Sequence, residues 1–138
     1  MSDVVMTNAE VLIALRTFGT AGTKTIPNVK ANYALAKARR KLTETAKDID
    51  TTRLELCEKY AARNEDGTAK KTTVRNDLGE DVEGFDLGEH AKAFADDYNA
   101  LLALSETLDG VRSVTTDELA GASLTNDELT GLGPLVTE

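Results

Sequence analysis

Hydrophobic side chains recur at helical spacing near the start of the chain. The segment Thr7-Asn8-Ala9-Glu10 has the capping-box pattern, in which a Thr hydroxyl and a Glu carboxylate each satisfy a backbone N–H of a helix's first turn. Gly19 is placed to end such a helix with a left-handed residue. We therefore predict a short helix over residues 7–18, with an apolar face made of Val11, Leu15 and Phe18.

A much longer helix is predicted over residues 28–64. Pro27 suits a helix's first turn, and no residue from Val29 to Asn64 breaks a helix. Such a helix is a rod of about 50 Å, too long to be covered by the rest of a compact domain of this size. Its apolar side chains fall seven apart, the spacing of a coiled coil, but the companion positions Ala38, Thr45 and Thr52 are small or polar. The stripe consists of Leu35, Leu42, Ile49 and Leu56.

Helical spacing disappears after the turn signal Asn64-Glu-Asp-Gly67. Residues 71–75 and 80–85 can pair as two short strands across residues 76–79. A lone hairpin is marginal without packing, so an exposed loop is the alternative. We predict a loop or a small β-hairpin over residues 65–85.

Another helix is predicted over residues 86–109. Asp86 and Glu89 repeat the capping-box pattern, and Asp109-Gly110 ends the segment. Its apolar side chains follow steps of four and three residues, interrupted by Ser105. We expect this helix to pack antiparallel on the long helix and to cover its Leu35 to Leu56 stripe.

The tail, residues 111–138, contains a short internal echo. Residues 115–121 and 125–131 each have Thr at a cap position, Glu three residues later, one Leu and a closing Gly. Each copy predicts a one-turn helix. With few aromatic residues and no Trp, the core must be built from aliphatic side chains, which favours helix packing. The fold class is therefore mainly α: a long helical hairpin with short elements at both ends, in one domain over residues 1–138.

Charge is divided unevenly along the chain. The formal net charge is −8, but residues 1–63 hold eleven Lys/Arg against seven Asp/Glu, and the remainder holds five against seventeen. Such a layout can draw the second half onto the first helices or pair one molecule with the next.

The chain has no apolar stretch long enough to span a membrane and no pattern of a signal peptide at its start, so we expect a cytoplasmic protein.

Candidate chemistry is sparse. The loop of residues 19–25 resembles a phosphate-binding loop but has the wrong spacing and follows a helix. The acidic residues Asp77, Glu80, Asp81, Glu83 and Asp86 lack the spacing of a calcium loop. His90 is the only histidine and is expected at the surface, and Cys57 is expected to be a small buried residue. We expect no catalytic, cofactor or metal residues and no small-molecule substrate, and hence no enzyme.

One basic patch stands out on the long helix, where Lys and Arg surround the apolar stripe. The chain's negative charge and the neighbouring Glu44, Asp48 and Asp50 favour a protein partner, or ion pairs within the chain, over nucleic acid. Leu54 points away from the Leu35 stripe and adds apolar surface at the helix's far end. The predicted partner-binding residues are Lys37, Arg40, Lys41, Lys47 and Leu54, with Arg39 in the same patch.

In this order the elements resemble a family of small uncharacterised proteins encoded by tailed bacteriophages and prophages. The resemblance covers residues 6–11, Pro27, residues 31–37, residues 56–60, the Asp66-Gly67 turn, the acidic helix from Asp86 and the tail to Leu132. Gly88 and the Ala-rich third helix depart from it, since bulkier residues are expected there. It implies a protein that acts by binding, in the bacterial host's cytoplasm or in the virion.

Two functions are therefore expected. The first is a non-catalytic virion or assembly component, or an oligomeric accessory protein, that contacts a protein partner or its own copies. The alternative is an acidic inhibitor of a host nuclease or anti-phage defence complex, in which the region after Asn64 imitates nucleic-acid charge.

Overall fold

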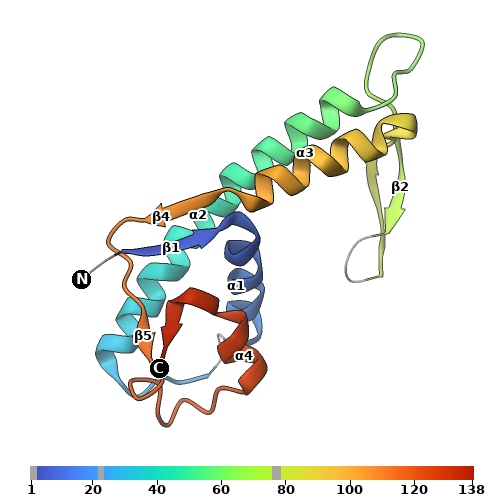
Figure 1. Cartoon of the computed structure of the whole chain (residues 1–138). Helices are drawn as coiled ribbons and strands as arrows, with labels where there is room; N and C mark the ends of the chain where they lie inside the picture. The colour runs from blue at the N-terminus through green and yellow to red at the C-terminus, as the bar shows by residue number, and fades with distance from the viewer. Residues whose placement is uncertain (1–2, 22–23, 76–78) are drawn as a thin grey trace. The chain divides into compact units, whose positions relative to one another are not determined.

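A computed structural model of the chain describes residues 3–21, 24–75 and 79–138 (Figure 1). The chain groups into two compact units, each described by itself below. Unit 1 comprises Met1–Ile49 and Leu102–Glu138, and unit 2 comprises Asp50–Leu101. The helix α2, Val29–Tyr60, contributes residues to both. A single domain over residues 1–138 stays a prediction, because compact grouping does not measure independent folding.

Unit 1 contains two small sheets with helices beside them. β1 (Val4–Thr7) pairs antiparallel with β4 (Ser105–Leu108), with Val4 opposite Leu108. β5 (Val114–Thr115) pairs parallel with β6 (Val136–Thr137). The remaining elements of this unit are α1 (Asn8–Ala21), the first part of α2, α4 (Asn126–Gly131) and the 3-10 turn η2 (Gly133–Leu135).

The start of α1 confirms the predicted capping box. The Thr7 N–H donates to Glu10 Oε1 at 2.9 Å, and the Glu10 N–H donates to Thr7 Oγ1 at 3.1 Å. The predicted end at Gly19 is wrong, because α1 continues to Ala21. Glycine permits a left-handed cap but does not impose one. The supposed phosphate-like loop is thus partly helix, and its residues 22–23 lie outside the described residues.

Helix α2 begins one residue after the predicted start and ends four residues early. Asn28 caps it, since its Oδ1 accepts the Ala31 N–H at 3.0 Å. After Tyr60 the backbone leaves the helix because Ala62 finds other partners. Its N–H donates to the Asp86 carbonyl and its carbonyl accepts the Lys70 N–H, both at 2.7 Å.

The apolar stripe of α2 is buried in unit 1, but its neighbours differ from the prediction. Leu35, Leu42 and Ile49 are buried. Leu35 faces α1 and the tail, lining a cavity of about 190 Å³ with Phe18 and Leu132. The third helix was expected to cover this position, and that expectation is wrong. The other large, fully buried side chains of unit 1 come from β1, α1 and the residues after β4: Met6, Val11, Val111, Val114, Leu132 and Leu135.

Unit 2 confirms the β-hairpin rather than the loop. β2 (Lys71–Arg75) and β3 (Asp81–Phe85) pair antiparallel, with Lys71 opposite Phe85 and Arg75 opposite Asp81. The turn at residues 76–78 lies outside the described residues. Ion pairs join the two strands, with Lys71 Nζ 3.3 Å from Glu83 and Arg75 Nε 3.5 Å from Asp81.

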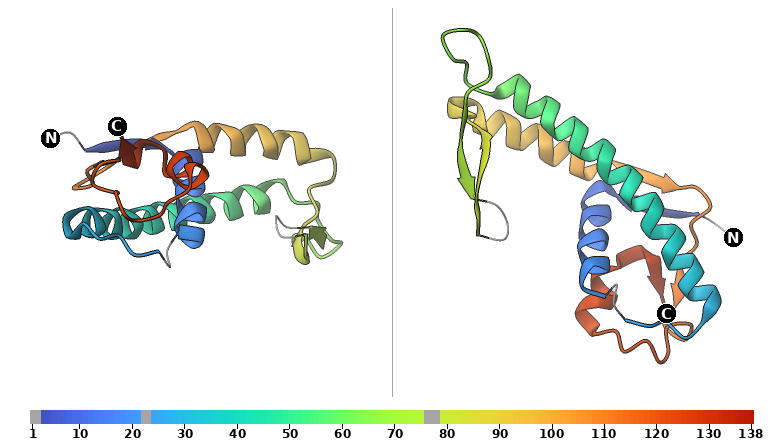
Figure 2. Two further views of the ribbon diagram at one scale, coloured as in Figure 1. Left: turned by 90° about the horizontal axis from the view of Figure 1, so that it is seen from below. Right: turned by 180° about the vertical axis from the view of Figure 1, so that it is seen from behind.

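The predicted helix over residues 86–109 is only partly correct. The Asp86–Glu89 capping box is wrong: the Asp86 carboxylate instead accepts the Gly88 N–H at 3.0 Å and leads into the 3-10 turn η1 (Gly88–His90). Helix α3 runs only from Ala91 to Ala103. It lies beside α2 within unit 2 (Figure 2), where the Tyr60 hydroxyl donates to Asp97 Oδ2 at 2.5 Å.

Residues 105–108, predicted as the end of that helix, form strand β4 instead. Their backbone groups bond to β1, and just before them the Leu104 carbonyl accepts the Asn8 N–H at 2.8 Å. The fold is therefore not purely helical, because short strand pairs accompany the helices in both units.

The two echo segments of the tail both form capping boxes but not the same element. Thr125 and Glu128 exchange both bonds at the start of α4, which confirms the predicted helix. Thr115 and Glu118 exchange the same two bonds, each at 3.1 Å, yet residues 116–121 form turns rather than a helix. Each Glu has a cation as well: Lys24 pairs with Glu128, and Arg112 with Glu118.

These two glutamates predict a loss of stability in acid. Bonds from Arg112 to Glu118 and from Lys24 to Glu128 hold both carboxyl pKa values below their usual 4.5. Their stabilisation is thus fully present above about pH 4.5 and is lost as the pH falls through the lower folded values. We expect the melting temperature to fall between about pH 5 and pH 3. The fall should be smaller in E118Q/E128Q, measured by circular dichroism. An equal fall in that variant would assign the acid sensitivity to other groups.

Candidate partner-binding surface on helix α2

The structure separates the predicted partner-binding residues. Lys37, Arg40, Lys41 and Lys47 lie on the part of α2 that belongs to unit 1. Leu54 lies in unit 2, with 43% of its surface exposed. Leu54 is therefore not part of the candidate surface, and of the four basic residues only Lys37, Arg40 and Lys47 share one face of α2.

These basic residues differ in whether a carboxylate neutralises them. Lys41 is paired with Glu44 at 3.6 Å, and the Arg39 guanidinium lies over the Phe18 ring, 5.8 Å from its centre. Most other Lys and Arg residues of the chain also have a carboxylate partner. Across residues 3–21, 24–75 and 79–138, five cations of this helix segment form no ion pair: Lys30, Lys37, Arg39, Arg40 and Lys47.

Several of these side chains share one face of α2. At roughly 100° per residue, a residue and those three, four or seven positions away lie on the same side of a helix. This side is turned away from the buried Leu35 and Leu42. We call it the outward face; it consists of Val29, Lys30, Tyr33, Lys37, Arg40, Glu44 and Lys47.

The N-terminal end of the outward face is apolar and unusually exposed. Val29 has 80% of its surface exposed and Tyr33 has 63%. Within the described part of the chain, these are the highest values among large hydrophobic side chains. A single exposed apolar side chain is ordinary, but two on adjacent turns, at i and i+4, form a small apolar patch.

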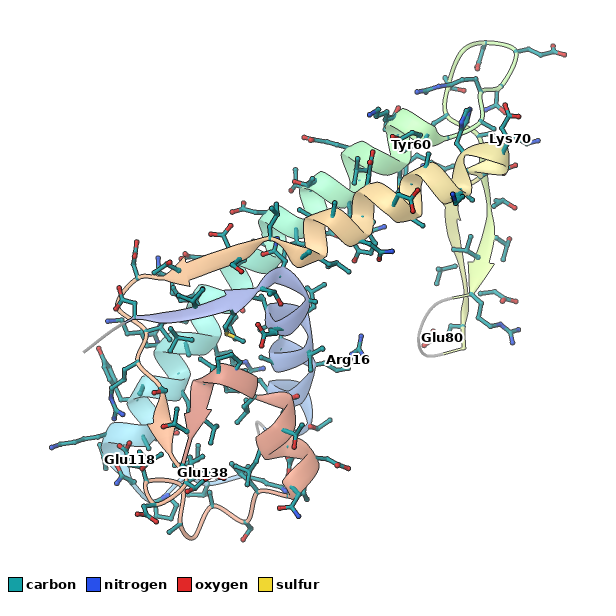
Figure 3. All side chains as sticks on the ribbon, viewed as in Figure 1. Arg16, Tyr60, Lys70, Glu80, Glu118 and Glu138 are labelled. Atoms are coloured by element: carbon teal, nitrogen blue, oxygen red, sulfur yellow. The ribbon has the colours of Figure 1, made fainter. Side chains whose placement is uncertain are left out.

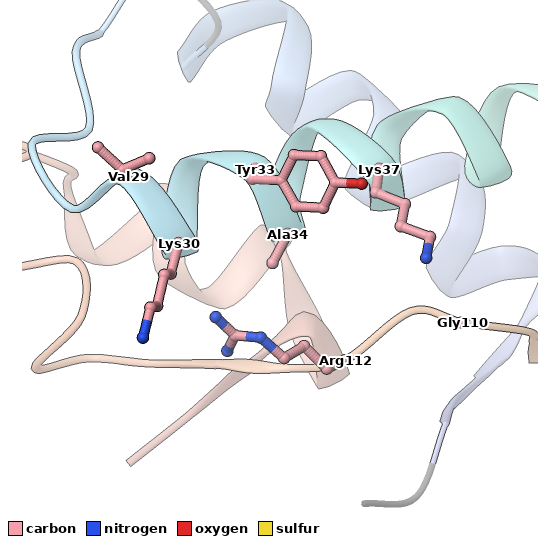
Figure 4. Close-up of a pocket in the computed structure, with 7 residues that line it drawn as sticks. All are labelled: Val29, Lys30, Tyr33, Ala34, Lys37, Gly110 and Arg112. Carbon is pink, nitrogen blue, oxygen red and sulfur yellow. The ribbon is translucent and has the colours of Figure 1, made fainter.

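A cleft of about 440 Å³ borders this patch (Figure 4). One wall is α2, and the other is the segment that follows β4. In Figure 4 the Tyr33 ring lies along the helix toward Lys37, and Arg112 reaches from the opposite wall. The cleft is lined by Val29, Lys30, Tyr33, Ala34, Lys37, Gly110 and Arg112.

Arg112 is held in place by its own carboxylate. Its two terminal nitrogens donate to the two Glu118 oxygens at 3.1 and 3.0 Å, and Nη1 also donates to the Ser113 carbonyl at 3.0 Å. Its charge is therefore largely neutralised within the chain. Lys30 and Lys37 are the two cations of the cleft without such a partner among the described residues.

Gly110 lets the opposite wall approach Lys37. Its backbone has a φ of +76°, in the region that side chains disfavour. A Cβ at this position would lie 3.0 Å from the Lys37 ammonium nitrogen. An added Cβ would therefore press on the flexible end of the Lys37 side chain.

Cys57 and His90, the two residues with potential chemistry, have different surroundings. Cys57 is buried as predicted, and burial raises the pKa of its thiol, so that it stays protonated at neutral pH. His90 is exposed as predicted, with its ring centre 6.2 Å from that of Tyr60 (labelled in Figure 3). Among the described residues, no cluster of three His, Cys, Asp or Glu side chains suits a metal ion. Asp77, of the acidic cluster, lies outside them.

Neither relatives nor membrane segments add to this description. No helix in the described part of the chain is long and apolar enough to cross a membrane. Compared with models of protein families, with curated proteins and with solved structures, the chain matches none.

Proposed function

We propose that this chain is a non-catalytic protein that acts by binding another protein through the outward face of α2. The observation that carries the proposal is the pair Val29 and Tyr33, both largely exposed on one face beside a cleft. Exposed aromatic side chains at a concave site are typical anchors of protein interfaces, because burying them in a partner removes apolar surface from water.

The proposed setting follows the resemblance to small proteins of tailed bacteriophages and prophages. In that setting the chain is a virion or assembly component, or an oligomeric accessory protein, in the host cytoplasm or the virion. Oligomers of the chain itself would use the same apolar patch. The proposal involves neither a cofactor nor a small-molecule substrate.

Serine substitution of the apolar patch tests this proposal. We expect the V29S/Y33S variant to capture about one tenth as much partner as the wild type, or less. The reason is that hot-spot side chains each contribute more than about 1 kcal/mol to binding. The measurement is quantitative capture from the native host, combined with light scattering of the purified protein. Both side chains are exposed, so the circular dichroism spectrum should not change.

The matched control is L104S. Leu104 belongs to the same unit and is 58% exposed, but it lies outside α2 and the cleft. We expect this variant to retain the partner at the wild-type level. If V29S/Y33S bound as well as L104S, or if the wild type were strictly monomeric and recovered no partner, the proposal would be wrong.

The alternative, an acidic inhibitor of a nuclease or defence complex, is favoured by the charge of unit 2. Residues 50–101 hold thirteen Asp/Glu against seven Lys/Arg. Its hairpin presents a less uniform charge, since Glu83 and Asp81 are paired with Lys71 and Arg75. Such an inhibitor would bind a basic nuclease surface with an affinity that falls steeply with salt, and a salt-insensitive complex would exclude this mechanism.

A further inference from the structure

We infer that the segment that docks on the outward face is an acidic stretch of another protein, carrying at least one apolar side chain between its carboxylates. This inference rests on the proposed function and specifies the chemistry of its partner. It is carried by two features that lie next to each other on α2: cations without partners and an exposed apolar patch.

The cleft contains two lysines whose charge is not neutralised within the described residues. Lys30 and Lys37 lie seven residues apart on α2, and both line the cleft. Across the described residues neither has a carboxylate partner, whereas the third cation of the cleft, Arg112, is bound by Glu118. The two ammonium groups are thus available to carboxylates from outside the chain, and Arg40 extends the positive charge along the outward face.

An apolar surface lies between these two cations. Val29, Tyr33 and the buried Ala34 form the helix side of the cleft. Its volume of about 440 Å³ falls within the range of ligand-binding pockets. An apolar side chain placed here covers the Tyr33 ring and brings flanking carboxylates toward Lys30 and Lys37. An isolated anion would leave this apolar surface exposed to water.

The charge of the neighbouring surface favours a protein segment over nucleic acid as the partner. Farther along α2 lies a groove of about 240 Å³ between α2 and β4, in which four carboxylates outnumber one cation, Lys41. A phosphate backbone that followed the cations toward Lys47 would meet this negative charge, and its aromatic stacking would be limited to Tyr33. The cations therefore suit a short acidic segment. The groove's carboxylates are Glu44, Asp48, Glu106 and Asp109.

The experiment uses the full chain and synthetic probes. A fluorescent peptide with Leu and Phe at helical spacing and Glu elsewhere is compared with two versions, in which Gln or Lys replaces every Glu. Binding is measured by fluorescence anisotropy at low and at high salt. We expect the Glu peptide to bind about tenfold more tightly than the Gln peptide at low salt, the Lys peptide to bind least, and the difference to shrink at high salt.

Charge reversal assigns the effect to the cleft. K30E/K37E should weaken binding of the Glu peptide by about tenfold or more, and the neutral variant K30Q/K37Q by less. The neutral variant keeps the test valid if the reversed one unfolds. The control is K92E: Lys92 lies in unit 2, is exposed, and also has no ion pair among the described residues. It should bind like the wild type.

A fluorescent single-stranded oligonucleotide is added as a fourth probe in the same assay. Four results would overturn the inference: no binding of the Glu peptide, equal binding of the Glu and Gln peptides, insensitivity to both lysine variants, or tighter binding of the oligonucleotide. Self-association that competes with the peptide would instead identify a second copy as the occupant. If V29S/Y33S abolished capture of the native partner while K30E/K37E did not, the proposed function would stand and the acidic partner would not. If neither variant reduced capture, both would fall.

Discussion

Replacing Leu42 with alanine is expected to lower the free energy of unfolding by about 2–5 kcal/mol, which is a large part of a small protein's total stability. The Leu42 side chain is completely buried near the middle of α2. Removing it costs the transfer free energy of the lost methyl groups and leaves a cavity that the surrounding side chains fill only in part. Urea titration followed by circular dichroism measures this change.

Leu54→Ala is the matched control, because it makes the same chemical change on the same helix. The side chain of Leu54 is 43% exposed, so its removal should cost much less than that of Leu42. Equal losses in the two variants would contradict the assignment of Leu42 to the core and of Leu54 to the surface.

Gly131→Ala is the second substitution with a large expected effect. A Cβ on Gly131 would lie 2.1 Å from Thr17 Oγ1, 3.1 Å from Thr17 Cβ and 3.2 Å from Thr17 Cγ2. Rotating the short Thr17 side chain cannot clear all three contacts, so α4 would have to move away from α1. We expect a loss of about 1–3 kcal/mol, as for other overpacked sites, measured by the same urea titration.

Gly19→Ala, in the same unit, is expected to increase the free energy of unfolding instead of lowering it. Gly19 is helical, and no atom lies within 4 Å of a Cβ added there. Because alanine loses less conformational entropy in a helix than glycine, this variant should gain about 0.5–1 kcal/mol.

Thr17→Ala should relieve part of the cost of Gly131→Ala. If the two costs were simply additive, the steric explanation would fail.

The elements that local sequence determines were predicted well. The capping boxes at Thr7 and Thr125 place their helices correctly because donor and acceptor lie only three residues apart. The pairing of the two hairpin strands could be predicted from the turn signals around residues 76–79, for the same reason, but their register could not. Short-range chemistry of this kind is visible in a single sequence.

The errors lie where distant partners decide the structure. Residues 105–108 fit a helical spacing, but their backbone pairs with β1, which lies near the other end of the chain. The local sequence of residues 105–108 does not predict that pairing. Packing against a neighbouring strand overrides their weak preference for a helix. The end of α2 was misplaced for a similar reason, since Ala62 bonds to Asp86 and Lys70.

The candidate surface could be predicted in part. The basic residues Lys37, Arg40 and Lys47 were visible as a patch, although their lack of ion pairs was not, and Lys41 proved to be paired with Glu44. Val29 and Tyr33 were missed. The signal was present, because both fall on the polar side of the helix opposite Leu35, where large apolar side chains have no core to enter.

The division of the chain also constrains the order in which it folds. Unit 2 is continuous, whereas unit 1 is assembled from two segments with unit 2 between them. During synthesis the residues of unit 2 leave the ribosome before the second segment of unit 1 exists. Strand β1 therefore cannot pair until β4 has been synthesised, and a pairing between residues so far apart in the sequence is of the kind that forms slowly. Until then the apolar side of α1 lacks the partners that cover it in the folded protein.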